Sequence, residues 1–127
     1  MTIKHIVVHC SDSPSDRGDT AKDIHRWHQE RGFDGIGYHA VILPTGEIEQ
    51  GRPHYWKGAH VKGHNHDSIG ICLIGQIHFN DEQKAALRDL IHELLRKYPK
   101  ADVVGHCDLD PKKTCPNFDV KDWWLHG

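Results

Sequence analysis

Ile6-Val7-Val8-His9 is the stretch of sequence that decides the fold class. Three consecutive β-branched apolar residues are typical of a strand buried on both faces, as in the sheets of α/β proteins. The strand is expected to run from residue 3 to 9, because Ser11-Asp12-Ser13-Pro14 breaks the pattern. A strand buried in this way needs neighbours on both sides, so the rest of the chain must supply further strands and the helices that cover them.

The remaining sequence alternates helix and strand signals. Thr20 and Asp23 form a capping pair that predicts a helix ending near Gly32. Asn80 and Gln83 form a second such pair, at the start of a longer helix. Strands are expected at 38–43, 47–50, 69–74 and 102–106, with a short closing helix at 119–124. This order predicts an α/β (α+β) fold with a central mixed β-sheet flanked by helices.

The composition fits one globular domain spanning residues 1–127. Lys and Arg number 16 against 18 Asp and Glu, and the sequence has no basic stripe, which argues against nucleic acid as a partner. No apolar run is long enough to cross a membrane. The first residues lack the apolar stretch of a secretion signal, so the protein is expected in the cytoplasm unless another factor releases it.

Three potential metal ligands stand at strand ends or in the loop after one. His9 closes the first expected strand, His106 closes Val-Val-Gly-His, and Cys115 lies in the loop that follows. Strands are stiff, so ligands at their ends are held at fixed separation. Three nitrogen and sulfur ligands leave one position open, which is the arrangement of a catalytic zinc site. Cys10 and Cys107 each follow a candidate histidine and should point to the opposite side of a continuing strand.

Spacing alone leaves ordinary alternatives open. A histidine at a strand end is usually a polar residue that reaches water, and a free cysteine is usually a small buried apolar residue. Cys72, inside Ile-Cys-Leu-Ile, is expected to be such a packing residue. Paired Cys-x-x-Cys motifs and His-Glu-x-x-His are absent from the sequence. His64-Asn65-His66 has the letters of an HNH nuclease, but three letters are weak evidence in a chain with 13 histidines.

Several motifs spread along the chain resemble those of one enzyme family. They are Ile-Val-Val-His-Cys-Ser (6–11), Ile-His-Arg-Trp-His (24–28), Gly-Tyr-His (37–39), Gly-Ala-His-Val-Lys-Gly-His-Asn-His-Asp-Ser-Ile-Gly-Ile-Cys-Leu-Ile-Gly (58–75) and Lys-Thr-Cys-Pro-Asn-Phe-Asp (113–119). In these motifs and their order the sequence resembles the zinc-dependent N-acetylmuramoyl-L-alanine amidases of the Amidase_2 and peptidoglycan-recognition fold. Within that family it is similar to the short lysozymes of T-seven-type phages.

The resemblance implies roles for seven residues and one zinc ion per chain. Without it, Tyr38 would be an ordinary strand aromatic and Lys113 a solvated loop charge. The matching positions imply zinc ligands at His9, His106 and Cys115, catalytic side chains at Tyr38 and Lys113, and substrate-groove residues at His60 and Asn65.

The implied reaction is hydrolysis of the amide bond between N-acetylmuramic acid and L-alanine in bacterial peptidoglycan. The resemblance further implies a monomeric endolysin that is made in the host cytoplasm and reaches the cell wall through a separate pore-forming protein. Phage RNA polymerase is a second partner of the phage lysozymes, but the N-terminal extension used for its inhibition is short in this chain. The alternatives are a non-catalytic peptidoglycan-binding module and a polymerase-interacting protein. Binding modules of this fold typically lose the cysteine ligand, whereas Cys115 is present.

Overall fold

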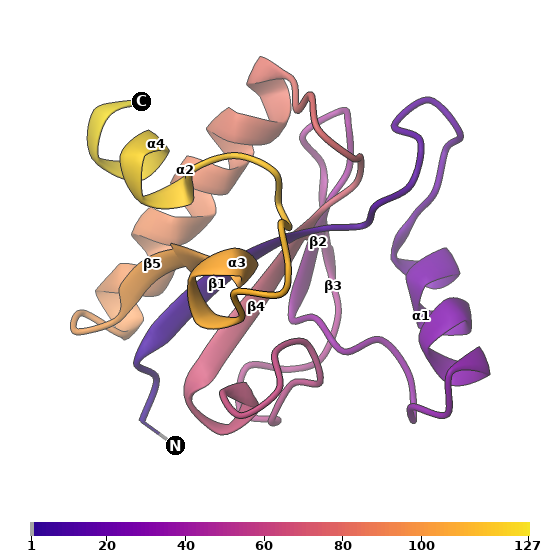
Figure 1. Ribbon diagram of the computed structural model, residues 1–127, viewed down its shortest axis with the longest axis horizontal. Coiled ribbons are helices and arrows are strands. Elements are labelled where there is room, and N and C mark those ends of the chain that lie inside the picture. Colours follow the sequence, from indigo (N-terminus) through magenta and orange to yellow (C-terminus); the bar gives the residue numbers. More distant parts are fainter. Residues whose placement is uncertain (1) are drawn as a thin grey trace.

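The computed structural model describes residues 2–127 and is built on a five-stranded sheet in the order β3-β2-β4-β1-β5 (Figure 1). Neighbouring strands are parallel except β2 and β3, which form an antiparallel hairpin. The strands are β1 (His5–Cys10), β2 (Ala40–Ile42), β3 (Ile48–Gln50), β4 (Ser68–Leu73) and β5 (Asp102–Gly105). The predicted central mixed sheet is therefore confirmed.

Strand β1 divides its side chains between two differently covered faces of the sheet. Ile6, Val8 and Cys10 belong to the main apolar core, whereas Val7 packs in a separate cluster on the other face. Side chains alternate along a strand, so His9 lies on the same face as Val7 and opposite to Cys10. The expected opposite orientation of Cys10 is confirmed. His9 thus lies on the face opposite the main apolar core.

Helix α2 (Asp81–Lys97) covers the core face of the sheet and lies behind it in Figure 1. Its start is fixed as the sequence predicts, because the Asn80 side chain accepts a hydrogen bond from Gln83 N at 2.8 Å. Burying each apolar side chain of its inner face contributes about 1.5–3 kcal/mol to folding. The buried apolar residues of this face are Leu87, Leu90, Ile91 and Leu94.

Helix α1 (Ala21–Glu30) lies beside the β2–β3 edge of the sheet (Figure 1). The predicted capping pair is present, since Thr20 N donates to Asp23 Oδ2 at 2.8 Å. Ile24 packs against residues of β2 and β4, and Ala21 N donates to the carboxylate of Glu49 in β3 at 2.8 Å. The helix is therefore tied to the sheet by both apolar and polar contacts.

Three short helices complete the described chain, and one of them corrects a strand prediction. These are η1 (Asn65–Asp67), α3 (His106–Leu109) and α4 (Val120–His126). The strand expected at 102–106 ends at Gly105, because the Asp108 carboxylate accepts from Gly105 N at 2.8 Å and starts α3 there. The expectation that Cys107 continues the strand is therefore wrong. No helix of the part described is long and apolar enough to span a membrane.

The position of Tyr38 corrects a second strand prediction. This residue was expected inside a strand at 38–43, but β2 begins at Ala40. Gly37, just before it, donates its N–H to the His28 side chain of α1 at 2.8 Å, and His39 N is the first group to donate to β4, through Gly70 O at 2.8 Å. Tyr38 therefore occupies the connection between α1 and the sheet.

Candidate active site

All seven residues to which the sequence assigns a role line one pocket of about 910 Å³. The pocket lies at the carboxyl ends of β1 and β5, where ligands commonly bind in sheets of this kind. The lining includes His9, Tyr38, His60, Asn65, His106, Lys113 and Cys115. They come from strand β1, from helices η1 and α3, and from three connecting segments.

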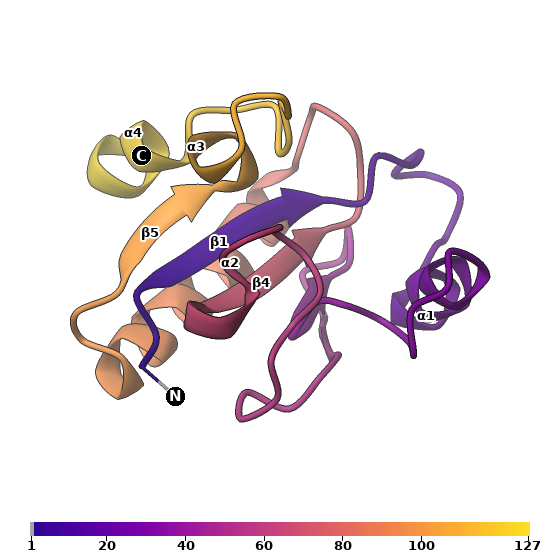
Figure 2. The same cartoon turned by 60° about the horizontal axis from the view of Figure 1, so that its bottom comes forward.

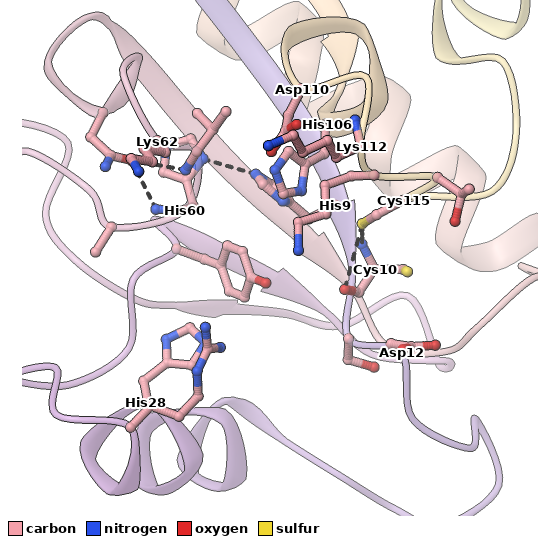
Figure 3. Close-up of a pocket in the computed structure, with 18 of the residues that line it drawn as sticks. His9, Cys10, Asp12, His28, His60, Lys62, His106, Asp110, Lys112 and Cys115 are labelled. Carbon is pink, nitrogen blue, oxygen red and sulfur yellow. Dashed lines mark hydrogen bonds between the residues drawn. The ribbon is translucent and has the colours of Figure 1, made fainter.

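His9, His106 and Cys115 form the centre of the pocket, with ligand atoms that all lie within 4.8 Å of one another. The two imidazole rings are 4.5 Å apart between centroids, and the Cys115 sulfur lies beside them (Figure 3). His9 is only 1% exposed, whereas His106 and Cys115 are half-buried. Two imidazoles and one thiol are the donor set of a tetrahedral zinc site with one position left open. The cluster could therefore hold a metal ion.

The surroundings of Cys115 also favour a bound cation. Its sulfur accepts a hydrogen bond from Cys10 N at 2.9 Å, which fixes the side chain against the end of β1. Hydrogen bonding with the Cys10 thiol and burial both raise the pKa of the Cys115 thiol. A thiolate at this place consequently needs a positive charge next to it, which a metal ion would supply.

A chain of hydrogen bonds fixes which nitrogen of His9 faces the cluster. The Ser68 hydroxyl donates to His64 O at 2.6 Å, so its oxygen must accept from His60 Nε2 at 3.1 Å. Burial lowers the pKa of His60 to about 3, so this ring is neutral and its Nδ1 accepts from His9 Nε2 at 2.8 Å (Figure 3). The Nδ1 lone pair of His9 is thereby left for a metal ion.

His60 and Asn65 line the pocket, but their polar atoms are largely engaged with the protein. Both ring nitrogens of His60 take part in the chain of hydrogen bonds just described. Asn65 Oδ1 accepts from His60 N at 2.8 Å and from Val61 N at 2.9 Å, which holds the loop in place. A Cβ added at Gly70 would lie 2.7 Å from the His60 ring, so only glycine fits beneath it. Substrate contact by the two side chains stays a prediction.

Tyr38 and Lys113 line the same pocket as the cluster. The Tyr38 ring is 5.0 Å from the His9 ring, and burial raises the pKa of its phenol well above the usual value. The phenol therefore keeps its proton and can act as a hydrogen-bond donor. Burial is the main cause of the lowered pKa of His106, and the charge of the exposed Lys113 lowers it further. The catalytic roles of Tyr38 and Lys113 stay predictions.

Two histidines of α1 hold the segment that carries Tyr38, a contact that sequence analysis missed. His25 Nδ1 accepts from Ile36 N at 3.0 Å, and His28 Nδ1 accepts from Gly37 N at 2.8 Å. His28 also lies against the Tyr38 ring, with the centroids 5.4 Å apart. Histidines three residues apart share one face of a helix, but the sequence does not say what that face contacts.

Acidification is expected to destabilise the protein partly through His28. Burial lowers the pKa of this ring from 6.5 to about 4. As the pH falls below 6.5, the unfolded chain takes up the proton first, so the free energy of unfolding declines until the folded form is protonated near pH 4. His28→Gln, which keeps an acceptor, should remove up to about 1.4 kcal/mol per pH unit from this slope.

The measurement is urea denaturation at several pH values between 7 and 4. His78→Gln, at an exposed histidine in the loop after β4, serves as the control and should leave the slope unchanged. Equal slopes for the His28→Gln and wild-type proteins would contradict the assignment.

The pocket lining carries more positive than negative side chains. The cations are Arg31, Lys62, Lys112 and Lys113, and the carboxylates are Asp12 and Asp110. The cations come from three separate segments of the chain, and only Lys112 and Lys113 are adjacent, so no long run of basic residues marks them in the sequence. Although the chain as a whole is nearly neutral, the pocket lining is net positive and suits an anionic ligand.

Comparison with known proteins agrees with this geometry. Residues 1–118 match the family described as N-acetylmuramoyl-L-alanine amidase (Amidase_2). The chain is 40% identical to the endolysin of Enterobacteria phage T3, over 97% of this chain and 86% of that protein. It is likewise 40% identical to the endolysin of Escherichia phage T7, over 94% of this chain and 83% of that protein.

Among solved structures, the endolysin N-acetylmuramoyl-L-alanine amidase LysCS from Clostridium intestinale URNW superposes with a TM-score of 0.86 at 30% identity. The match covers 94% of this chain and 78% of that one. Fold, site and sequence thus lead to the same conclusion: this chain belongs to the N-acetylmuramoyl-L-alanine amidase family.

Proposed function

We propose that this protein is a peptidoglycan amidase that hydrolyses the bond between N-acetylmuramic acid and L-alanine, with one zinc ion bound by His9, His106 and Cys115. The observation that carries the proposal is the cluster of two imidazoles and one thiol inside the pocket of about 910 Å³. Membership of the amidase family supports the reaction, and similarity to phage endolysins supports the bacterial cell wall as the substrate.

The residues around the cluster have different roles in the proposed reaction. When bound, zinc would act as a Lewis acid and lower the pKa of water toward neutrality. The hydrogen bond from His9 Nε2 to His60 leaves the Nδ1 of His9 as the nitrogen that would hold the ion. The Tyr38 phenol, which keeps its proton, orients the attacking water from the wall of the pocket.

Lys113 acts later in the reaction, where negative charge develops. Attack on the lactyl carbonyl places that charge on the carbonyl oxygen, and the Lys113 ammonium at the pocket rim stabilises it. The other lining cations, among them Arg31 and Lys62, suit the carboxylates of the peptide stem. The site therefore combines a charged binding surface with a buried reactive centre.

Digestion of purified cell walls tests the proposal. Cleavage should release new amino groups, identified as N-terminal L-alanine, without new reducing sugar ends. A chelator should stop the release, and added zinc should restore it. New reducing ends would show a glycosidase instead, and binding to cell walls with no cleavage would show a binding module.

A further inference from the structure

A second group of metal-type side chains lies at the opposite end of β1 from the pocket. His5 begins β1, His64 directly precedes η1, and Asp67 ends η1 immediately before β4. Strands β1 and β4 begin at the same end of the sheet, next to the N-terminus (Figure 2). His5 and His9 are four residues apart, which is about 13 Å along a strand. The two groups are therefore separate sites.

The geometry of this group suits a metal ion. Ligand atoms of His5, His64 and Asp67 all lie within 4.8 Å of one another. The two imidazole rings are 5.5 Å apart between centroids and nearly perpendicular, at 83°. Asp67 is only 8% exposed, whereas the His64 side chain is 35% exposed. The group is therefore buried on one side and open to solvent on the other.

Two buried polar atoms in this group have no hydrogen-bond partner. They are Nδ1 of His5 and Oδ1 of Asp67. His64 Nδ1 lies 4.0 Å from this Asp67 oxygen, which is too far for a hydrogen bond. Buried polar atoms are rarely left unpaired, because removing them from water is costly. A bound cation would satisfy both atoms at once.

The main chain holds the three side chains in place without an ion. Asp67 O accepts from Lys4 N at 2.7 Å, which joins the end of η1 to the residue before His5. His64 O accepts from the Ser68 hydroxyl at 2.6 Å, and His64 N donates to Val61 O at 3.1 Å. Such an arrangement lowers the conformational cost of binding a ligand.

We propose that His5, His64 and Asp67 form a second metal site, which binds a first-row transition-metal ion of the zinc type. Two imidazoles and one carboxylate suit such ions, whereas Ca²⁺ and Mg²⁺ prefer oxygen ligands. His66, whose side chain is 70% exposed and lies 3.6 Å from Asp67, is close enough to shield the ion from solvent. The bound ion fastens the loop before β4 to the start of β1.

A short stretch of chain connects the proposed second metal site to the pocket. His60, four residues before His64, donates through Nε2 to the same Ser68 hydroxyl that binds His64 O. An ion at the second site therefore restrains the loop that orients His9. Its role is to stabilise this loop, and the chemistry remains at the first cluster.

Zinc titration of the protein that already carries its first equivalent tests the proposal. Free Zn²⁺ is raised stepwise, and bound metal is measured after equilibrium dialysis. Bound zinc should rise from one to two equivalents, and the second should raise the melting temperature by several degrees, since binding to the folded form alone stabilises it. His5→Ala and His64→Ala should each lose the second equivalent and keep the first. His78→Gln, at an exposed histidine elsewhere, should keep both.

A paramagnetic probe on the unaltered protein covers the case in which a variant fails to fold. Added Co²⁺ should broaden the NMR signals of residues 4–6 and 64–68 before those of other exposed histidines. Wild-type protein that stops at one equivalent would overturn the proposal. So would a second equivalent that survives both alanine variants, or Co²⁺ broadening centred elsewhere.

Discussion

Replacing Cys115 by serine is expected to abolish zinc binding and amidase activity together. The substitution removes the single sulfur ligand of the His9, His106 and Cys115 cluster. A serine hydroxyl is a poor zinc ligand at neutral pH, because it does not release its proton readily. Without the ion, the pKa of water in the pocket is no longer lowered enough to make it a nucleophile at neutral pH, so the rate should fall by roughly three orders of magnitude or more.

Metal content and cell-wall cleavage measured on the same preparation test this expectation. Cys107→Ser makes the same chemical change at a half-buried cysteine of α3 that lies outside the cluster, and it should keep both zinc and activity. Far-UV circular dichroism separates loss of the ion from loss of the fold. A Cys115→Ser protein that still holds one tight zinc would show that another residue is the third ligand, and Cys107 would be the first to test.

The sequence could predict features that depend on residues close together in the chain. The apolar run before His9 predicted β1, and the Asn80–Gln83 pair predicted the start of α2. Both predictions succeeded because strand burial and helix capping depend on residues that are close together in the sequence. The expected ends of the elements were less accurate. Asp108 caps α3 from three residues beyond Gly105, and this single contact moved His106 out of its expected strand.

Contacts between distant segments could not be predicted in this way. The chain of hydrogen bonds from His9 to His60 and Ser68 joins residues up to 59 positions apart, and it depends on the parallel pairing of β1 with β4. The three candidate metal ligands followed from their positions at strand ends, whereas Tyr38, Lys113, His60 and Asn65 were named only from the family resemblance. The resemblance includes His28 in one of its motifs but assigns it no role, although its contact with Gly37 N positions the Tyr38 segment.

Lys113→Ala and Tyr38→Phe are expected to give the opposite pattern to Cys115→Ser, with zinc retained and turnover lost. Neither side chain belongs to the metal cluster, although both line the pocket. The Lys113 ammonium is exposed and packs little, so its removal should leave the melting temperature unchanged. Tyr38→Phe removes only the hydroxyl and keeps the ring that lies 5.0 Å from the ring of His9.

The loss in each variant should appear mainly in kcat. Lys113 stabilises charge that develops only on the way to the transition state, so substrate binding should change little while the rate falls by roughly 10²- to 10³-fold. The Tyr38 phenol is protonated throughout, because burial raises its pKa. Loss of its hydroxyl should lower the rate by a similar factor, because the attacking water is no longer oriented.

Zinc content, melting temperature, kcat and KM measured on each variant distinguish these effects from loss of the ion. Lys121→Ala and Tyr55→Phe, at exposed positions outside the pocket, make the same changes where no effect on rate is expected. Full activity in Lys113→Ala would show that this side chain is an ordinary solvated charge, and loss of zinc in Tyr38→Phe would show that the tyrosine supports the metal cluster instead of the reaction.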